Sequence, residues 1–299
     1  MDGVLVPPSV LQFVNTIVEP AYFNKNFTTL IAAVKAADPS ILTTLLGDGP
    51  SSNGMTLFAP TNAAFTAAGI NELPDQATLN AVLAYHLLDG VVLSTGLPVT
   101  SAASPAAIPT VGGDNFYLSN QGGDAGVYIN GNTMVTAVDI DPSEGAGTAN
   151  GVVHVIDRTL IPPSQDIVQI AIDAGFNVLA AGLVAAELDD DLQGAGPFTV
   201  FAPTDAAFNA AGITVDNIAG VAGLEDILLY HVLGLRAFST DLVDGLSANT
   251  LSVGDTFTIN LNGGASITDG AGETANITSV NILGTNGVIH VIDKVILPQ

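Results

Sequence analysis

The sequence contains no cysteine and few basic residues. Without cysteine, disulfide bonds and thiolate metal sites are excluded. Lysine and arginine together number 5 against 29 acidic residues, so the formal net charge is −24. Phosphate backbones and anionic membrane surfaces are bound chiefly through lysine and arginine, so neither nucleic acid nor a membrane surface is an expected partner. We interpret the acidic residues as a coat that keeps a 48% hydrophobic chain soluble; the alternative is adaptation to salty water or use of divalent cations at the surface.

Long hydrophobic runs are also lacking. No apolar run reaches the roughly 18 to 20 residues that a membrane-spanning helix needs, so no direct insertion into a membrane is expected. The first residues lack the basic and then apolar pattern of a secretion signal, which would therefore lie upstream if the protein is exported. The GxSxG pattern of a nucleophile elbow does not occur, which removes the support for a hydrolase of that kind.

What is present is a duplication. The phrase TLFAPTNAAFTAAGI from Thr56 returns as FTVFAPTDAAFNAAGI from Phe198, and NGVVHVID from Asn150 returns as NGVIHVID from Asn286. Between the two phrases each copy has a Tyr-His pair, in LAYHLLDG and in LLYHVLGL. The phrases keep their order while their separations differ by a few residues, as expected for equivalent elements joined by unequal loops. The sequence therefore predicts two copies of a whole domain rather than a string of short repeats.

These phrases resemble the conserved blocks of the fasciclin-like (FAS1) family. The FAPT phrase resembles its first block, the NGVIHVID phrase its second, and the Tyr-His pair the motif between them. The resemblance implies an α+β fold of two tandem domains, each a wedge of two β-sheets flanked by several helices. It also implies a secreted or cell-surface adhesion module that is not an enzyme and needs no cofactor. Expected partners are then extracellular matrix, glycans or cell-surface proteins.

The closing residues of each copy indicate the domain boundaries. Residues 3–8 read GVLVPP, which echoes the TLIPP and VILP that end the two copies. We therefore predict that residues 1–8 are a remnant of the last strand of an upstream repeat. Domain 1 is predicted at residues 9–163 and domain 2 at residues 164–299, both within a longer protein of several repeats.

Local patterns predict the helices of each copy. Ser164 is predicted to cap a helix that begins near Ile167, and the next helix is predicted to end in the acidic run at residues 189–191. Thr61 and Thr204 are predicted to cap short helices that follow a buried strand. A further helix in each copy is predicted to hold the Tyr-His pair near its end.

Apolar and polar residues that alternate predict the strands. Buried strands are expected at residues 55–59 and 198–202. Alternating strands are expected at residues 115–118, 127–130 and 134–140, and again at 256–261, 266–268 and 275–282. The phrase VVHVID is apolar at nearly every position, which is typical of a strand with both faces covered.

The Tyr-His pairs are the candidate ligand-binding residues, because the resemblance implies that this region takes part in adhesion. They are Tyr85, His86, Tyr230 and His231. The alternative is that each tyrosine packs in the core and each histidine bonds a backbone carbonyl at the helix end, since the flanking leucines favour burial. His154 and His290 lie in the middle of apolar strands and are interpreted as core histidines whose hydrogen bonds are satisfied.

A calcium site is the metal hypothesis that so acidic a chain invites. Asp139 and Asp141 fit the first positions of a helical calcium-binding loop, but Glu144 replaces the glycine and Asn150 replaces the final glutamate. A looser site built from Asp139, Asp141 and Glu144 stays open, with a solvated turn as the alternative.

The sequence thus favours a non-catalytic adhesion or matrix-binding pair of modules from a longer surface protein, in which weak modules gain strength from multivalency. The alternative function is a structural spacer or a self-assembling subunit of an extracellular fibre.

Overall fold

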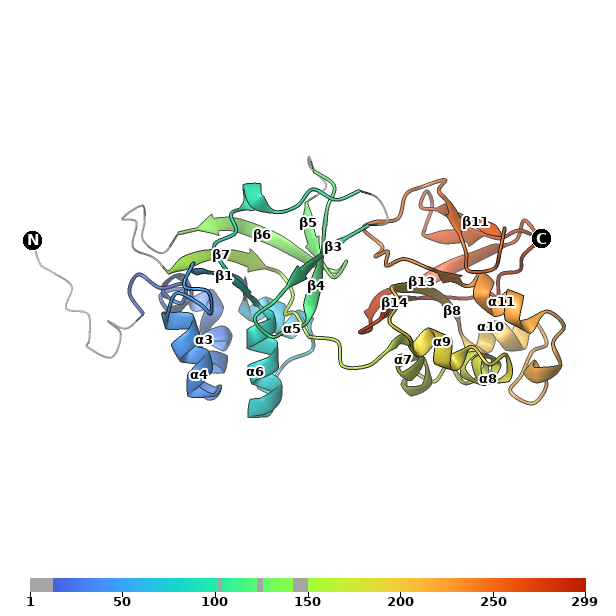
Figure 1. Ribbon diagram of the computed structural model, residues 1–299, viewed down its shortest axis with the longest axis horizontal. Helices are drawn as coiled ribbons and strands as arrows, with labels where there is room; N and C mark the ends of the chain where they lie inside the picture. Colours follow the sequence, from blue (N-terminus) through green and yellow to red (C-terminus); the bar gives the residue numbers. More distant parts are fainter. Residues whose placement is uncertain (1–12, 102–103, 123–125, 142–149) are drawn as a thin grey trace, which may run out of the picture. The chain divides into compact units, whose positions relative to one another are not determined.

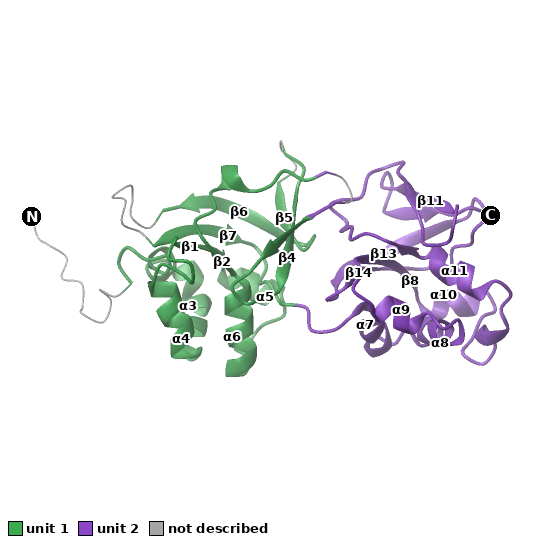
Figure 2. Ribbon diagram, viewed as in Figure 1, with its two compact units in different colours: residues 1–100, 106–162 green, residues 101–105, 163–299 purple. Residues whose placement is uncertain are grey.

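The computed structural model describes residues 13–101, 104–122, 126–141 and 150–299, which form two compact units (Figures 1 and 2). Unit 1 comprises residues 1–100 and 106–162, and unit 2 comprises residues 101–105 and 163–299. The predicted remnant at residues 1–8 lies outside the described residues, and the domain boundaries stay predictions.

Unit 1 is built from short helices and a mixed sheet. The helices are α2 (Glu19–Tyr22), η1 (Lys25–Phe27), α3 (Thr28–Ala36), α4 (Pro39–Leu46), α5 (Asn62–Ala67), α6 (Gln76–Tyr85) and η2 (Ser94–Gly96). The strands are β1 (Met55–Pro60), β2 (Leu87–Asp89), β3 (Ala106–Pro109), β4 (Asn115–Asn120), β5 (Val127–Ile129), β6 (Thr133–Ile140) and β7 (Gly151–Ile156). They lie in the order β2-β1-β7-β6-β5-β4-β3, in which β1 and β7 run parallel.

The long strand β6 joins the two halves of this sheet. Thr133 and Met134 pair with β5, whereas residues 135–140 pair with β7 across two register shifts. Figure 1 shows α3, α4 and α6 on one side of the half that contains β1 and β7. The predicted wedge of two sheets flanked by helices is confirmed, with one strand shared by both sheets.

Unit 2 repeats the same plan. Its helices are α7 (Ile167–Asp173), α8 (Asn177–Ala185), α9 (Asp189–Gln193), α10 (Asp205–Ala210), η4 (Ile218–Gly220) and α11 (Leu224–Tyr230). Its strands are β8 (Phe198–Pro203), β9 (Val232–Leu233), β10 (Ser247–Asn249), β11 (Thr256–Asn260), β12 (Ser266–Thr268), β13 (Thr274–Leu283) and β14 (Gly287–Ile292). Their order, β9-β8-β14-β13-β12-β11-β10, matches that of unit 1 strand for strand. The duplication predicted from the sequence is therefore a duplication of topology.

Each unit has its own hydrophobic core. Successive residues of a strand face opposite sides, so Leu57 packs with the helices while Phe58 packs with Phe116 of β4. In unit 2, Val200 and Phe201 divide in the same way between two clusters. None of the four clusters among the described residues mixes the two units.

Some local predictions are confirmed and others are wrong. Thr61 and Thr204 are N-caps, and each accepts a hydrogen bond of 3.1 Å from a backbone N–H of its helix. The cap of α7 is Asp166 rather than Ser164. The acidic run at residues 189–191 does not end α8, which stops at Ala185; it begins α9, where the helix dipole favours carboxylates.

Candidate functional site

The two tyrosines of the candidate site are buried, and each connects the end of a helix to the start of a strand. Tyr85 ends α6, is 1% exposed, and its hydroxyl donates to the carbonyl of Asn115 over 2.9 Å. Tyr230 ends α11, and its hydroxyl donates to the carbonyl of Thr256 over 2.8 Å. Asn115 and Thr256 are the first residues of β4 and β11. Burial raises the pKa of Tyr230, so its hydroxyl keeps the proton that it donates.

The two histidines bind backbone groups with both ring nitrogens. His86 Nδ1 lies 2.7 Å from the carbonyl oxygen of Val82, and its Nε2 accepts from the N–H of Leu160 over 3.0 Å. His231 makes the same pair of contacts, with Ile227 at 2.7 Å and Ile296 at 3.2 Å. A carbonyl only accepts and an amide N–H only donates, so each ring is neutral with its proton on Nδ1.

Through these contacts, the segment that follows the last strand of each unit, at Leu160 or Ile296, is bound to the end of the helix that carries the Tyr-His pair. Burial lowers the pKa of His86 and of His231 to about 4, so both rings stay neutral at physiological pH. The interpretation of core tyrosines and carbonyl-bound histidines is confirmed. All four side chains are at most 1% exposed, so a partner would reach them only after the helix end opened, and their role in recognition stays a prediction.

The remaining histidines lie in the central strands. His154 Nε2 donates to the carbonyl of Val92 over 2.9 Å, and its Nδ1 accepts from the N–H of Asp139 over 3.3 Å. His290 donates to the carbonyl of Ala237 over 2.9 Å, but its Nδ1 has no partner. The prediction of a satisfied core histidine is therefore confirmed for His154 and wrong for one nitrogen of His290. Burial lowers the pKa of His290 to about 4.

Asp139, the first residue of the calcium hypothesis, stabilises a turn at Ser94 through its carboxylate. Its backbone has a positive φ of 56°, and its carboxylate accepts hydrogen bonds from the N–H (2.7 Å) and the hydroxyl of Ser94. Desolvation opposes ionisation of this group, but the bonds from Ser94 outweigh it and lower the pKa of Asp139. In unit 2, Asn281 has a φ of 62°; its amide oxygen accepts from the N–H of Ser239 over 2.7 Å, and its amide nitrogen donates to the Ser239 hydroxyl over 2.8 Å. What the two turns share is an oxygen that accepts from the serine N–H, which a carboxylate or an amide can supply.

Of the other two residues of that hypothesis, the structure describes only Asp141. Asp141 follows β6 directly, and Glu144 lies outside the described residues. Within the part of the chain that the structure describes, no three His, Asp or Glu side chains form a group that could hold a metal ion. The three-residue calcium site stays a prediction.

One asparagine in each unit, to which the sequence assigned no structural role, bonds segments that are far apart along the chain. Asn150 accepts from the N–H of Ile17 over 2.7 Å and donates to the carbonyls of Leu45 (2.9 Å) and Gly47 (2.5 Å). Their repetition in both copies of the NG phrase was the available signal.

Asn286 makes the same set of bonds in unit 2. It accepts from Ile167 over 3.0 Å and donates to Leu192 and Gly194, both over 2.8 Å. A Cβ on the following Gly287 would lie 2.8 Å from the carbonyl oxygen of Phe198, which explains the glycine. In unit 2, the NG dipeptide therefore connects the start of β14 to the first residue of α7 and the end of α9 through hydrogen bonds.

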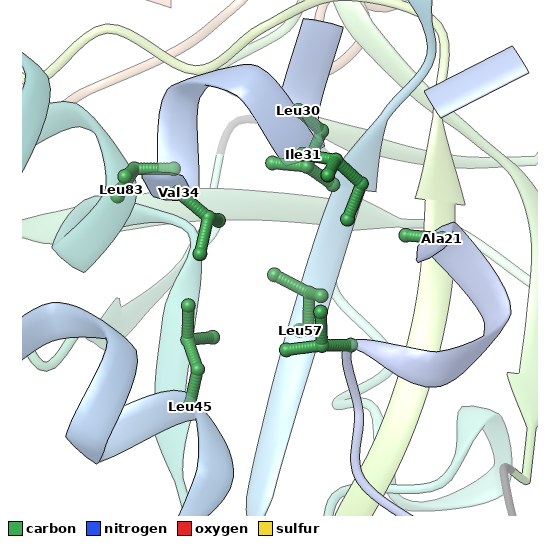
Figure 3. Close-up of a pocket in the computed structure, with 8 residues that line it drawn as sticks. Ala21, Leu30, Ile31, Val34, Leu45, Leu57 and Leu83 are labelled. Atoms are coloured by element: carbon green, nitrogen blue, oxygen red, sulfur yellow. The ribbon is translucent and has the colours of Figure 1, made fainter. Parts of the chain in front are cut away.

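Small apolar cavities lie under the helices of both units. The cavity of unit 1, about 10 Å³, is enclosed by residues of α2, α3, α4, α6 and β1, seven of which are labelled in Figure 3. The equivalent cavity of unit 2 measures about 20 Å³. Such volumes hold about one water, and an apolar lining offers it no partners. We interpret both as packing voids.

The fold and the site define a class of protein: tandem α+β domains in which the repeated polar residues bond the backbone and stabilise each domain. The chain matches the Fasciclin domain at residues 25–162 and 174–298, and it belongs to that family.

Relatives come from animals and bacteria. Transforming growth factor-beta-induced protein ig-h3 of Sus scrofa is 31% identical over 265 residues, 84% of this chain and 35% of that protein. Protein sll1483 of Synechocystis sp. is 38% identical over 154 residues, 50% of this chain and 74% of that protein. A solved FAS1 domain pair from the insect cell adhesion molecule Fasciclin I has a TM-score of 0.41 at 21% identity, covering 91% of this chain and 97% of that chain. The chain spans about a third of the first of these relatives. No helix among the described residues is long and apolar enough to cross a bilayer.

Proposed function

We propose that the chain is an adhesion or matrix-binding pair of fasciclin domains from a longer, multi-repeat surface protein, and that it is not an enzyme. The observation that carries the proposal is where the reactive side chains lie. All four histidines are at most 1% exposed, and each bonds at least one backbone carbonyl; buried in this way, none is presented to a substrate as a general base or to solvent as a metal ligand. Recognition is then left to the exposed surfaces of the two units.

The proposed partners are extracellular matrix, glycans or cell-surface proteins, and the proposed location is secreted or at the cell surface. Family membership over both units supports this. The strong negative charge also disfavours nucleic acid and anionic lipid as partners. Weak sites on successive domains would add up through effective concentration.

A binding array of glycans and matrix proteins, probed with and without calcium, tests the proposal. For any ligand that binds in the array, the affinity of the whole chain is compared with the affinities of two fragments, residues 13–162 and residues 163–299. We expect the pair to bind at least ~10-fold more tightly than either unit alone when the ligand is presented at high density. Equal affinities would contradict a multivalent mode, and turnover of a substrate in the same screen would contradict the non-catalytic assignment.

The calcium hypothesis is part of this proposal and has its own test. Calcium is expected to raise the thermal midpoint of the whole chain and of unit 1, and Asp141→Asn is expected to abolish that rise. Asp189→Asn, a change in the acidic run of α9, serves as the control. An equal response of the two variants would mean general screening by the cation rather than a site.

A further inference from the structure

A hollow of about 390 Å³ on unit 1 combines aromatic rings with a cation. Its lining includes Phe13, Tyr22, Val34, Lys35, Pro39 and Leu42, and we refer to it as the aromatic-lysine groove. The rings of Phe13 and Tyr22 stack at 4.7 Å, and Lys35 Nζ lies 5.4 Å from the centre of the Tyr22 ring. Lys35 is one of only 5 basic residues in the chain. A volume in the range of ligand sites, with a positive charge at its edge, favours an apolar occupant that carries an acid.

The equivalent face of unit 2 has the opposite character. Asn150 and Asn286 bond the N–H groups of Ile17 and Ile167, so these two residues correspond, and Tyr22 corresponds to Ile172. In α3 and α8 the buried residues Val34 and Leu183 correspond, so Lys35 corresponds to Val184.

This face of unit 2 exposes apolar side chains beside an acid. Ile172 is 49% exposed and Val184 is 64% exposed. The exposed Asp173 follows Ile172, and its carboxylate accepts hydrogen bonds from the side-chain amides of Gln165 and Gln169, which hold it without neutralising it. We refer to Ile172, Asp173 and Val184 as the apolar-acidic face.

We propose that the aromatic-lysine groove of one molecule receives the apolar-acidic face of a second copy of this chain. Lys35 would meet Asp173, while Ile172 and Val184 would cover the half-buried ring of Tyr22, which stacks on the buried ring of Phe13. Because the two surfaces differ, a molecule whose groove is filled still has a free face, so further copies can add head to tail. This inference goes beyond adhesion, since it needs no external partner, and it gives the alternative of a self-assembling subunit a specific interface.

The net charge predicts how the proposed association depends on salt concentration. Two copies that each carry −24 repel each other over long distances, whereas the proposed contact pairs opposite charges at short range. Salt screens exposed charges beyond about 8 Å at physiological ionic strength, so moderate salt should strengthen the association rather than weaken it.

Sedimentation velocity of the full chain over a concentration series at moderate salt tests the proposal. The parent chain is expected to form species larger than dimers as concentration rises. Lys35→Glu alters the groove and Val184→Lys alters the face, and each is expected to weaken association at least ~10-fold, a change of about 1.4 kcal/mol. Val253→Lys, at a valine of unit 2 that is 99% exposed and outside the face, is the matched control and should leave association unchanged.

Mixing the two interface variants gives the sharpest result. The Lys35→Glu chain keeps its face and the Val184→Lys chain keeps its groove, so a 1:1 mixture is expected to form heterodimers and stop there. A double variant, Lys35→Glu with Asp173→Lys, should recover association through the reversed pair. A parent chain that stays monomeric, variants that associate like the parent, or a mixture without heterodimers would each overturn the proposal. The adhesion array is also run on Lys35→Glu. Ligand binding by this variant tests the proposed function independently of self-association, so failure of one proposal can be told from failure of the other.

Discussion

At the scale of single residues, the two copies act as internal controls for each other. The Tyr-His pair and the NG asparagine are identical in both copies because their partners are backbone groups whose positions the fold fixes. Asp139 and Asn281 differ because the Ser turn that they hold accepts either a carboxylate or an amide. Identity at these positions therefore reflects geometric need, and the difference between Asp139 and Asn281 shows that the turn does not require the charge.

Asn286→Ala should be among the most destabilising substitutions of a polar residue in unit 2. It removes three hydrogen bonds and leaves the N–H of Ile167 and the carbonyls of Leu192 and Gly194 unsatisfied in a buried place. We expect a loss of about 2 to 4 kcal/mol in the free energy of unfolding, measured by urea denaturation. Asn209→Ala, on the exposed side of α10, is the control and should change it by less than about 0.5 kcal/mol. Similar losses for the two variants would refute the structural role.

The buried histidines should make stability depend on pH. The pKa values of His86, His231 and His290 are about 4 in the folded chain against 6.5 for the ordinary side chain. Between those values the unfolded chain binds more protons, so the free energy of unfolding falls as pH drops from about 6.5 to about 4. The loss approaches about 3 kcal/mol for each histidine at the low end.

Urea midpoints at several pH values between 7 and 4.5 measure this slope, in enough salt to screen the general repulsion between carboxylates. His290→Gln should flatten the slope for unit 2, whatever it does to stability at pH 7. Midpoints that do not move over this range would show that the histidines are not held neutral by burial.

Sequence could predict residue roles only where the partner is near in the chain. The caps Thr61 and Thr204 bond a group three residues away, and each Tyr-His histidine bonds a carbonyl four residues back, so local patterns indicated both. The partners of Asn286 lie 92 to 119 residues away, and a single sequence does not show that they meet.

At the scale of elements, the FAPT phrase encodes a strand and the start of a helix. Pro203 ends β8, and the hydroxyl of Thr204 accepts from the N–H of Ala207 to begin α10. Thr204→Ala should cost about 1 kcal/mol in the free energy of unfolding, because one backbone donor at the helix start loses its partner. Thr204→Ser keeps an acceptor and should recover most of that loss. Equal losses for alanine and serine would point to packing of the methyl group instead of the cap.

The long elements were predictable and the short ones were not. Strand β13 shows polar and apolar residues in alternation over most of its length, β6 is long and rich in apolar residues, and α6 shows helical spacing. Strands β2 and β9 have three and two residues and are separated from the preceding helix by a single histidine, so their leucines and valine resemble a continuation of the helix. Their extended form depends on pairing with β1 and β8, which is a property of the sheet.

At the scale of the whole molecule, the repeated order of strands explains why the phrases recur as they do. The FAPT strand and the VIHVID strand are parallel neighbours in each unit, the second and third of its seven strands, and nearly all their residues are buried. Loops between them are free to change length without moving this pair. The sequence could therefore establish domain number and fold class from two phrases, while the groove of unit 1, made by residues that differ between the copies, left no repeated pattern to find.

Because each core cluster contains residues of one unit, each unit should fold by itself. Residues 163–299 make a domain of ordinary size, large enough to bury a core without disulfides or metal. Expressed alone, this segment should unfold in one cooperative transition, and Asn286→Ala should lower its free energy of unfolding by the same amount as in the full chain. Agreement within about 0.5 kcal/mol is the expected result for a change whose partners all lie within the unit. A segment without a cooperative transition would mean that the interior of unit 2 is completed by residues outside it, and the account of two independent cores would fail.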